Sequence, residues 1–302
     1  MRIGLFLVDT TPIDQQIETV VAAERDGFDG VWFSDIFGVD ALMMIALAGR
    51  QTSRIEMGTS VVPVYPRQPW DMARRALFAQ AATGGRLTLG IGLSHAPVVE
   101  GMWGLSYEKP ARHMREYMSV LGPLVREGRV SFQGEVFRTT AGVQVPGATS
   151  FPILIAALAP VMLRVAGEQA EGTITWMTGR KTIETHVAPR INAAAEAAGR
   201  PKPRICVALP IAVTNDAAGA RERAGQMFQV YGQLPNYKRM LAKEGAAGPQ
   251  DVVVVGNEAE VEQQLRGFAA AGATDFTGAI FPVEEGSMER TRALLQGLVG
   301  KV

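Results

Sequence analysis

Three residues near the start of the chain have side chains suited to proton transfer, and they follow apolar runs. Ser34 and Asp35 end a run that begins at Gly30, and His95 comes shortly after the run Leu87–Ile91. A carboxylate and an imidazole in such positions can hydrogen-bond a ligand or exchange a proton with it. The same residue types also cap helices and form turns. We favour a ligand-site role for Asp35 and His95, with capping or turn formation as the alternative.

A second group of candidates surrounds a proline that is expected to open a helix at position 160. A helix N-terminus offers free N–H groups and a favourable dipole to an anion, and the small alanines before the proline allow a phosphate to come close. Two threonines in a later apolar run add hydroxyl donors. Plain helix capping is the competing interpretation. The candidate cofactor-binding residues of this group are Ala157, Leu158, Ala159, Thr173, Thr175 and Trp176.

The remaining motifs point away from several common chemistries. Gly90 and Gly92 resemble the start of a dinucleotide-binding glycine motif, but the third glycine position is His95. We interpret Gly92 as a place where a planar ring can approach the backbone. No H-E-x-x-H or G-x-S-x-G motif is present, and the single cysteine, Cys206, excludes an internal disulfide and a cysteine-cluster metal site. A cofactor-dependent mechanism without a metal site is the simplest expectation.

The elements that position these residues follow one pattern along the whole chain. An apolar run, typical of a strand, is followed by a segment in which apolar residues have helical spacing. Eight such alternations, with runs suited to strands buried on both faces, predict a (β/α)8 TIM barrel with insertions and a single domain over residues 1–302. Because all strands of such a barrel end at one face, their polar ends would meet there. The predicted strands are Arg2–Val8, Gly30–Ser34, Ile55–Val62, Leu87–Ile91, Ile153–Ala157, Thr173–Trp176, Arg204–Val213 and Thr274–Phe281.

Two intervals are longer than the barrel needs, Ser94–Phe151 and Asp216–Gly256. Within the first, alternation over Val130–Val145 predicts a small β-excursion. Within the second, Asp251–Gly256 is either a short strand or a packed loop. We expect the substrate pocket to be built from the loops Ile36–Asp40 and Ser94–Pro110 and from the region Met227–Lys243.

Composition limits the class of partner. The chain has 302 residues, of which 47% are hydrophobic, and its 30 basic and 30 acidic residues cancel. No global field attracts nucleic acid or an anionic membrane, no apolar run approaches the roughly 18 residues of a membrane span, and no secretion signal is evident. We expect a small-molecule substrate, no nucleic acid or membrane partner, and a cytoplasmic location, which agrees with the single cysteine.

Five stretches, taken together, are similar to one family. The chain resembles the luciferase-like monooxygenase superfamily, and more narrowly its branch of oxidoreductases that use the deazaflavin coenzyme F420. The match spans nearly the whole chain, and the stretches occur in the expected order. They are Val31–Asp35 (VWFSD), Gly58–Pro69 (GTSVVPVYPRQP), Gly85–His95 (GRLTLGIGLSH), Ala156–Trp176, and, more weakly, Val253–Gly272.

The resemblance implies an F420-dependent enzyme that transfers a hydride between the deazaflavin and a small organic substrate. Ser60 and Val61 match a family bulge with a non-prolyl cis peptide that supports the cofactor ring, whereas strand physics alone favours an ordinary strand. Ser34 is implied as a further cofactor contact, and Asp35 and His95 as polar contacts or a proton relay. Two alternatives remain: an FMN-dependent monooxygenase, and a non-catalytic barrel that binds F420 or a flavin.

The chain also departs from the family pattern, and this bears on the assignments. Many relatives have histidine after the aspartate of the second strand, where this chain has Ile36, so that histidine's role cannot be transferred. Relatives are commonly homodimers, and the resemblance extends that expectation to this chain. The helices after the second and third strands are candidates for the interface through Met43, Met44, Ile45, Leu47 and Met72. Arg67 and Arg180–Lys181 are predicted to attract the anionic tail of F420.

Overall fold

The computed structural model describes residues 1–302, and its central feature is a closed parallel barrel of eight strands. Strand β1 pairs with both β2 and β12, and β10 pairs with both β9 and β12, so the sheet closes on itself. The (β/α)8 fold predicted from the alternation is confirmed. The barrel strands are β1 (Arg2–Leu7), β2 (Gly30–Phe33), β3 (Glu56–Thr59), β5 (Leu87–Gly92), β8 (Ile153–Ala156), β9 (Gly172–Trp176), β10 (Arg204–Val213) and β12 (Asp275–Ile280).

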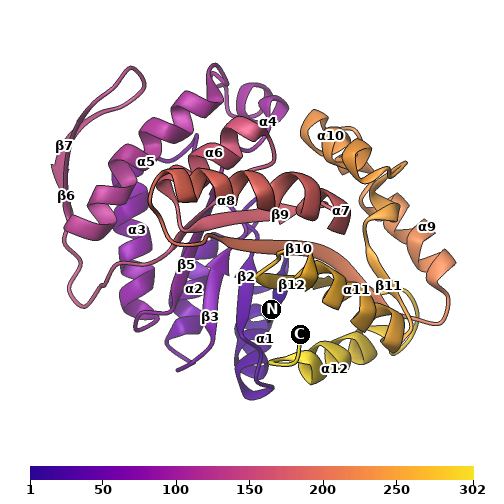
Figure 1. The fold of residues 1–302 in the computed structure, drawn as a ribbon. Coiled ribbons are helices and arrows are strands. Elements are labelled where there is room, and N and C mark those ends of the chain that lie inside the picture. Colours follow the sequence, from indigo (N-terminus) through magenta and orange to yellow (C-terminus); the bar gives the residue numbers. More distant parts are fainter.

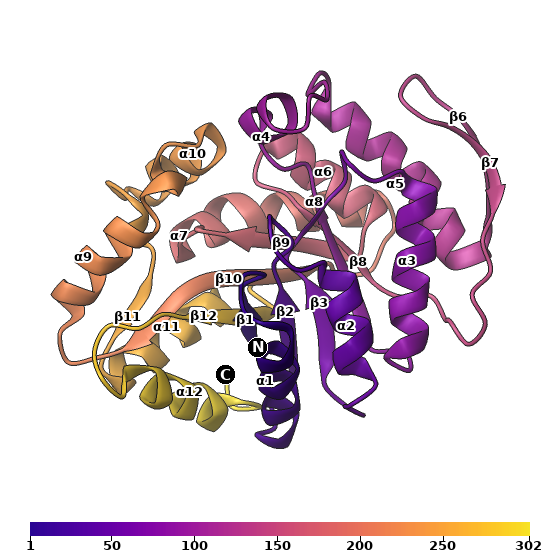
Figure 2. The same cartoon turned by 180° about the vertical axis from the view of Figure 1, so that it is seen from behind.

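The helices form a layer around the barrel (Figures 1 and 2). Most of them return the chain from one strand to the next, as the helical spacing predicts. They are α1 (Ile13–Arg25), α2 (Ala41–Gly49), α3 (Pro69–Ala82), α5 (Pro110–Glu127), α6 (Pro160–Gln169), α7 (Arg180–Thr182) with a π-helical turn at Ile183–Val187, α8 (Ala188–Ala197), α11 (Glu258–Ala270) and α12 (Ser287–Leu298). No helix is both long enough and apolar enough to cross a membrane.

The two overlong intervals contain the extra structure. The first holds α4 (Ala96–Gly101) and an antiparallel hairpin of β6 (Arg129–Gln133) and β7 (Arg138–Gly142), which confirms the predicted β-excursion. The second holds α9 (Ala217–Met227), α10 (Pro235–Glu244) and 3-10 turns at Gln229–Gly232 and Pro249–Asp251. It ends in β11 (Val254–Gly256), which pairs with β10, so this segment is a short strand rather than a loop.

The third predicted strand is wrong in one respect. It does not run unbroken over Ile55–Val62: β3 stops at Thr59, and a separate two-residue strand, β4 (Val62–Pro63), pairs with β5. The interruption is the Ser60–Val61 peptide bond, which is cis. The bulge expected from the resemblance is therefore confirmed, and it is the reason why the regular strand ends early.

Side-chain size decides how the barrel interior is filled. Trp32 on β2 is buried and occupies the middle of the barrel, where Gly58 on β3 leaves it room. A Cβ atom at Gly58 would collide with the indole ring. Trp32 packs with Leu154, Ile174 and Cys206, which come from three other strands. This apolar plug separates the two ends of the barrel, so polar groups at one end do not contact those at the other.

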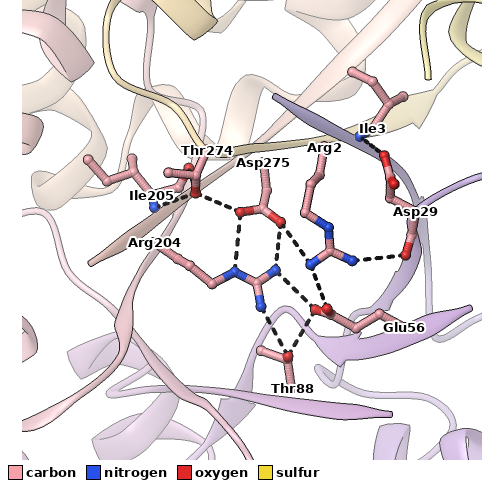
Figure 3. A network of polar contacts seen from close by, with 9 residues as sticks. All are labelled: Arg2, Ile3, Asp29, Glu56, Thr88, Arg204, Ile205, Thr274 and Asp275. Carbon is pink, nitrogen blue, oxygen red and sulfur yellow. Dashed lines mark hydrogen bonds and ion pairs between the residues drawn. The ribbon is translucent and has the colours of Figure 1, made fainter. Parts of the chain in front are cut away.

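The amino end of the barrel is closed by a network of charged side chains (Figure 3). Arg204 on β10 donates to both oxygens of Asp275 at 2.6 and 3.3 Å, and to Glu56 at 3.0 Å. Arg2 donates to the other oxygen of Glu56 at 2.5 Å. Burial lowers the pKa of Arg204, but the hydrogen bonds to Asp275 and the charges of Asp275 and Glu56 together outweigh burial and leave the pKa raised. These residues join four strands at the end of the barrel opposite the candidate site.

The proposed apolar dimer face is partly wrong. Met44, Ile45 and Met72 are at most 1% exposed, because they pack into the chain's own core between the barrel and its helices. They therefore have no surface to bury against a second subunit. Met43 and Leu47, from the same expected set, are 60% and 48% exposed on α2.

Candidate active site at the carboxyl ends of the strands

The barrel wall at the carboxyl ends of the strands is lined mainly by small and aromatic side chains. Phe6 on β1 and Trp176 on β9 stack with their ring centroids 5.2 Å apart. Phe6, Val61 and Ala156 are also packed on the buried plug below. Gly92 leaves room for Val61, since a Cβ there would lie 2.7 Å from a Val61 methyl. Flat apolar surfaces of this kind suit a planar ring system.

Asp35 lies just beyond β2 in an ion pair that the sequence did not reveal. Its two carboxylate oxygens are 3.1 and 3.3 Å from Nη2 of Arg67, which belongs to the turn after β4. Burial raises the pKa of Asp35, and the opposing charge of Arg67 does not fully offset that effect. The helix cap next to it is Asp40, which accepts from the N–H of Met43 at 3.0 Å. Asp35 is thus chiefly an ion-pair partner, with a long contact of 3.4 Å to the N–H of Ala41.

Ser34 is engaged with a residue that sequence reasoning missed, Asp9. The Ser34 hydroxyl donates to the Asp9 carboxylate at 3.0 Å and accepts from the Asp9 N–H at 2.8 Å. The other carboxylate oxygen of Asp9 accepts from the N–H groups of Ile36, Phe37 and Gly38 at 2.7 to 2.9 Å. Asp9 therefore shapes the loop after β2. Its place just beyond the first apolar run was the signal that could have identified it.

His95 lies at the same end of the barrel, at the N-cap of α4, and is half-buried. Its ring centroid is 5.6 Å from that of Tyr237 on α10. Burial lowers the pKa of His95, so the imidazole is neutral at physiological pH. A neutral imidazole can accept a proton, which is the chemistry the sequence suggested for this position.

The other two histidines are packed within helical segments, as expected. His113 on α5 stacks on Tyr65 with centroids 4.1 Å apart, and burial lowers its pKa to about 4. His186 lies in the π-helical turn, 3% exposed, with Nε2 2.7 Å from the carbonyl oxygen of Leu158.

The residues of the predicted phosphate site are divided between two faces of the barrel wall. Side chains of β9 alternate between the two faces of the wall. Ile174 and Trp176 face the barrel interior, whereas Thr173 and Thr175 face the helices. The Thr173 hydroxyl donates to the carbonyl oxygen of Ile155 at 2.8 Å and is used within the wall. Thr175 Oγ1 and Trp176 Nε1 are buried without a hydrogen-bond partner. Of this set, Trp176 is best placed to contact a ring at the strand ends.

The loop after β8 has the character expected of an anion site. Ala157 is buried, and Leu158 and Ala159 lead into α6, whose first turn receives no side-chain cap. The N-terminal turn of α7 is different. The carboxylate of Glu244, on α10, accepts from the N–H groups of Lys181 and Thr182 at 3.0 and 2.7 Å. One helix N-terminus is therefore already occupied by a carboxylate of the chain, and the other is not.

The predicted tail-binding cations follow β4 and β9 at the carboxyl end of the barrel, and two of them lie close to carboxylates of the chain. Arg67 is committed to Asp35, with its side chain 19% exposed. Arg180 packs against Gly267 on α11 and lies 3.9 Å from Glu184, on the outer helix layer. Neither guanidinium lines the groove beside α6 that other cations border. That these cations attract the tail of F420 stays a prediction.

The segment between β10 and β11 covers the aromatic wall. Phe228 and Tyr231 meet Trp176 edge-on, with centroids 6.1 and 5.8 Å apart. Tyr237 packs edge-on against Tyr231 at 5.2 Å and also faces His95. Residues from the second insertion therefore complete the surroundings of the candidate site. The sequence predicted that the Met227–Lys243 region contributes to the pocket, but it did not single out these aromatic side chains.

Comparison with known proteins agrees with this geometry. A model of the luciferase-like monooxygenase family matches residues 1–280. The chain is 28% identical to a Mycobacterium tuberculosis protein provisionally named a coenzyme F420-dependent oxidoreductase, across 97% of this chain and 98% of the relative.

Solved structures show the same fold at low identity. Coenzyme F420-dependent tetrahydromethanopterin reductase from Methanopyrus kandleri has a TM-score of 0.78 and 20% identity, over 100% of this chain and 98% of its own. The oxygenating constituent of 3,6-diketocamphane monooxygenase from Pseudomonas putida, in complex with FMN, has a TM-score of 0.75 and 16% identity, with the same coverage. The barrel and the family match over most of the chain lead to one conclusion: the chain is an enzyme of the luciferase-like monooxygenase family.

Proposed function

We propose that this enzyme is a coenzyme F420-dependent oxidoreductase that transfers a hydride between the deazaflavin and a small organic substrate. The observation that carries the proposal is the juxtaposition, at one end of the barrel, of the Phe6–Trp176 wall, the Val61 bulge and the neutral His95. The full-length relative provisionally named as F420-dependent supports the choice of cofactor. When bound, the deazaflavin supplies the carbon that gives or takes the hydride.

The residues present fit such a cofactor. Val61 and Trp176 would contact the ring system, since both lie on the apolar wall at the strand ends. The uncapped first turn of α6, with Ala157, Leu158 and Ala159 before it, would hold the phosphate. Gly92 would allow the ring to approach by giving Val61 its space. Thr173 and Thr175, which face the helices, would support the wall.

His95 and Asp35 would then have separate roles. His95 would accept, or return, the proton that accompanies hydride transfer at a substrate hydroxyl or carbonyl oxygen. Asp35, already paired with Arg67, would act as a positioning residue for the loop that borders the ring. Ser34 would help to hold the same loop through its hydrogen bond to Asp9.

The experiment is a titration of the purified protein with F420 and with FMN, followed by turnover without oxygen. Tighter binding of F420 and anaerobic reduction of F420 by candidate alcohols would support the proposal. Tighter FMN binding with oxygen-dependent turnover would favour the monooxygenase alternative, for which the FMN-bound neighbour provides the shared fold. Binding without any turnover would instead indicate a carrier or sensor.

We also propose that the enzyme is a homodimer that buries Met43 and Leu47 of α2 with Phe78 of α3. These apolar side chains are 48 to 62% exposed on two neighbouring helices. Exposed apolar groups gathered on one face mark association surfaces. Light scattering should give the dimer mass, and replacing Met43 and Leu47 by aspartate should shift the population to monomer. A constant monomer mass over a wide concentration range would refute the dimer.

A further inference from the structure

The imidazole of His95 has no hydrogen-bond partner in the chain, so its direction depends on the backbone that carries it and on packing. The ring of Tyr237, from α10, lies 5.6 Å from it between centroids. The carbonyl oxygen of His95 accepts from the N–H groups of Val98 and Val99 at 2.9 Å, which fixes the side of the residue that leads into α4. The direction of the imidazole therefore depends on what fixes the other side, the peptide between Ser94 and His95.

The backbone of Ser94 is left-handed, with φ +59°, a conformation that is unfavourable for a residue with a Cβ atom. Three non-glycine residues of the chain have a positive φ, and two of them adjoin residues of the candidate site. Ser94 precedes His95, and Met177 follows Trp176. Such a backbone persists only where its surroundings hold it, and it occurs often at functional sites. The contact that holds Ser94 is therefore important for His95.

That contact comes from Tyr107, in the loop between α4 and α5. Its hydroxyl donates to the carbonyl oxygen of Ser94 at 3.2 Å. Since this oxygen belongs to the peptide that joins Ser94 to His95, the hydrogen bond restrains the plane from which His95 projects. The N–H of Tyr107 donates to the carboxylate of Glu100 at 3.3 Å, and this ties the loop to α4.

The phenol ring of Tyr107 is supported by the barrel wall through Tyr65. The two rings lie 5.2 Å apart between centroids, and Tyr65 follows β4, which pairs with β5. The strand that leads into Ser94 and the ring that supports Tyr107 thus belong to neighbouring parts of one wall. The hydroxyl of Tyr65 is buried without a hydrogen-bond partner, so Tyr65 contributes its ring and not its oxygen.

We propose that Tyr107 is a positioning residue for His95, whose imidazole stays directed to the candidate site because the Tyr107 hydroxyl holds the preceding peptide. The place of Tyr107 in the reaction rests on the proposed function, in which His95 exchanges the substrate proton. Without the hydroxyl, Ser94 can leave the left-handed region, and the imidazole then turns away from Tyr237 toward solvent.

The first experiment follows the His95 imidazole itself and needs neither cofactor nor substrate. The chain has three histidines, so a histidine-labelled sample gives few NMR signals, and the signal absent from H95N is that of His95. Burial lowers the pKa of His95, and the side chain that faces its ring is the Tyr237 phenol, whose pKa burial raises, so Tyr237 stays neutral during the titration. In Y107F the pKa of His95 should move up toward 6.5, because the ring becomes more exposed. Y65F, which removes a hydroxyl without a partner from the ring beside it, is the matched control and should leave the pKa as in wild type.

The second experiment is steady-state turnover of F420 by the same variants, with circular dichroism to show that each is folded. Y107F should lower kcat by about tenfold and change KM by less than about twofold, since a misdirected base affects the reaction more than binding. Glycine adopts a positive φ without strain, so the left-handed backbone of S94G needs less support from Tyr107. S94G/Y107F should therefore recover part of the lost kcat and of the lowered His95 pKa.

Two results would overturn the positioning role. One is a Y107F variant with the His95 pKa of wild type, and the other is an equal shift in Y65F and Y107F, which would assign the effect to ring packing. If Y107F shifts the pKa of His95 but wild type does not turn over F420, the proposed function fails while the placement of His95 by Tyr107 stands.

Discussion

His95 and Asp35 lie at the same end of the barrel in different electrostatic surroundings. Burial lowers the pKa of the His95 imidazole, which is packed by Tyr237 and caps no helix N–H. Burial raises the pKa of the Asp35 carboxyl group, and the charge of Arg67 offsets only part of that rise. The resemblance implied polar contacts or a proton relay for both residues, and these different surroundings favour His95 for the exchange of a proton.

Replacing His95 by asparagine should lower kcat by roughly 10²- to 10⁴-fold, the range for loss of a general acid or base, and leave F420 affinity nearly unchanged. In the oxidation direction, wild-type kcat/KM should fall on the acid side as the imidazole protonates. Because burial lowers its pKa from 6.5, the midpoint should lie below that value. Steady-state kinetics across pH and a binding titration check this. His113→Asn is the control, and a pH profile unchanged by H95N would remove the assignment.

Replacing Arg67 by methionine should destabilise the fold by about 3–5 kcal/mol, because a buried carboxylate is left unpaired. Asp35 has a raised pKa, so it takes up a proton readily, and the loss should shrink as the pH falls and the neutral form is populated. Urea denaturation at neutral and acidic pH measures this. D35N/R67M should recover most of the stability, whereas an equal loss in the double variant would show that Arg67 acts through other contacts.

At the scale of elements, carboxylates that accept several backbone N–H groups hold loops and helices in place. Asp9 does this for the loop after β2, and Glu244 for the start of α7. Glu24, on α1, does the same for the turn before β3. It accepts from the N–H groups of Ser53, Arg54 and Ile55 at 2.6 to 3.0 Å. In each case one side chain satisfies N–H groups that have no partner in regular structure.

Glu24→Gln should lower the free energy of unfolding by about 1–2 kcal/mol at neutral pH, since charged hydrogen bonds are lost at a site that solvent partly screens. Burial raises the pKa of Glu24, but the hydrogen bonds outweigh burial and lower it from 4.5 to about 2. Its contribution is therefore complete above the unfolded value and is lost as the pH falls toward 2.

The measurement for Glu24 is chemical denaturation of wild type and variant between neutral pH and the acid limit. The two curves should converge on acidification. Glu18→Gln, an exposed change on the same helix, is the matched control and should follow wild type at every pH. A difference between wild type and E24Q that stayed constant with pH would contradict the role of the ionised carboxylate.

At the scale of the whole molecule, a charged network closes one end of the barrel (Figure 3), and the candidate active site lies at the other end. The buried cluster around Trp32 lies between them. The network of Arg2, Glu56, Arg204 and Asp275 joins strands that lie far apart in sequence. This arrangement agrees with the general division of such barrels into a stability face and a catalytic face.

Arg204→Met should destabilise the enzyme by about 3–5 kcal/mol, because Asp275 is 3% exposed and would lose its main partner. Since the network lies at the opposite end from His95, the folded variant should retain wild-type F420 affinity. Thermal unfolding and a binding titration measure the two effects. Arg223→Met, at an exposed position on α9, is the control. A large loss of cofactor affinity without loss of stability would contradict this division.

The local sequence pattern was sufficient to predict most of the strands and helices. The strand Arg204–Val213 has the same bounds in prediction and structure, because an apolar run is a local signal. The eightfold repetition of those signals determined the barrel. The cis peptide at Ser60–Val61 could be predicted only from the family resemblance, because the residues themselves favoured a regular strand there.

Tertiary structure alone decided which of the polar residues are free for chemistry. Asp35 and Arg67 are 32 residues apart, and Thr182 and Glu244 are 62 apart, so no spacing rule pairs them. Thr173 and Trp176 belong to one strand but face opposite sides of the wall. The cations that border the first turn of α6 come from two other helices, Arg190 from α8 and Arg239 and Lys243 from α10. The sequence by itself determined which residues reach the catalytic end of the barrel. Side-chain direction and long-range pairing, which depend on closure of the barrel, decided what each can do there.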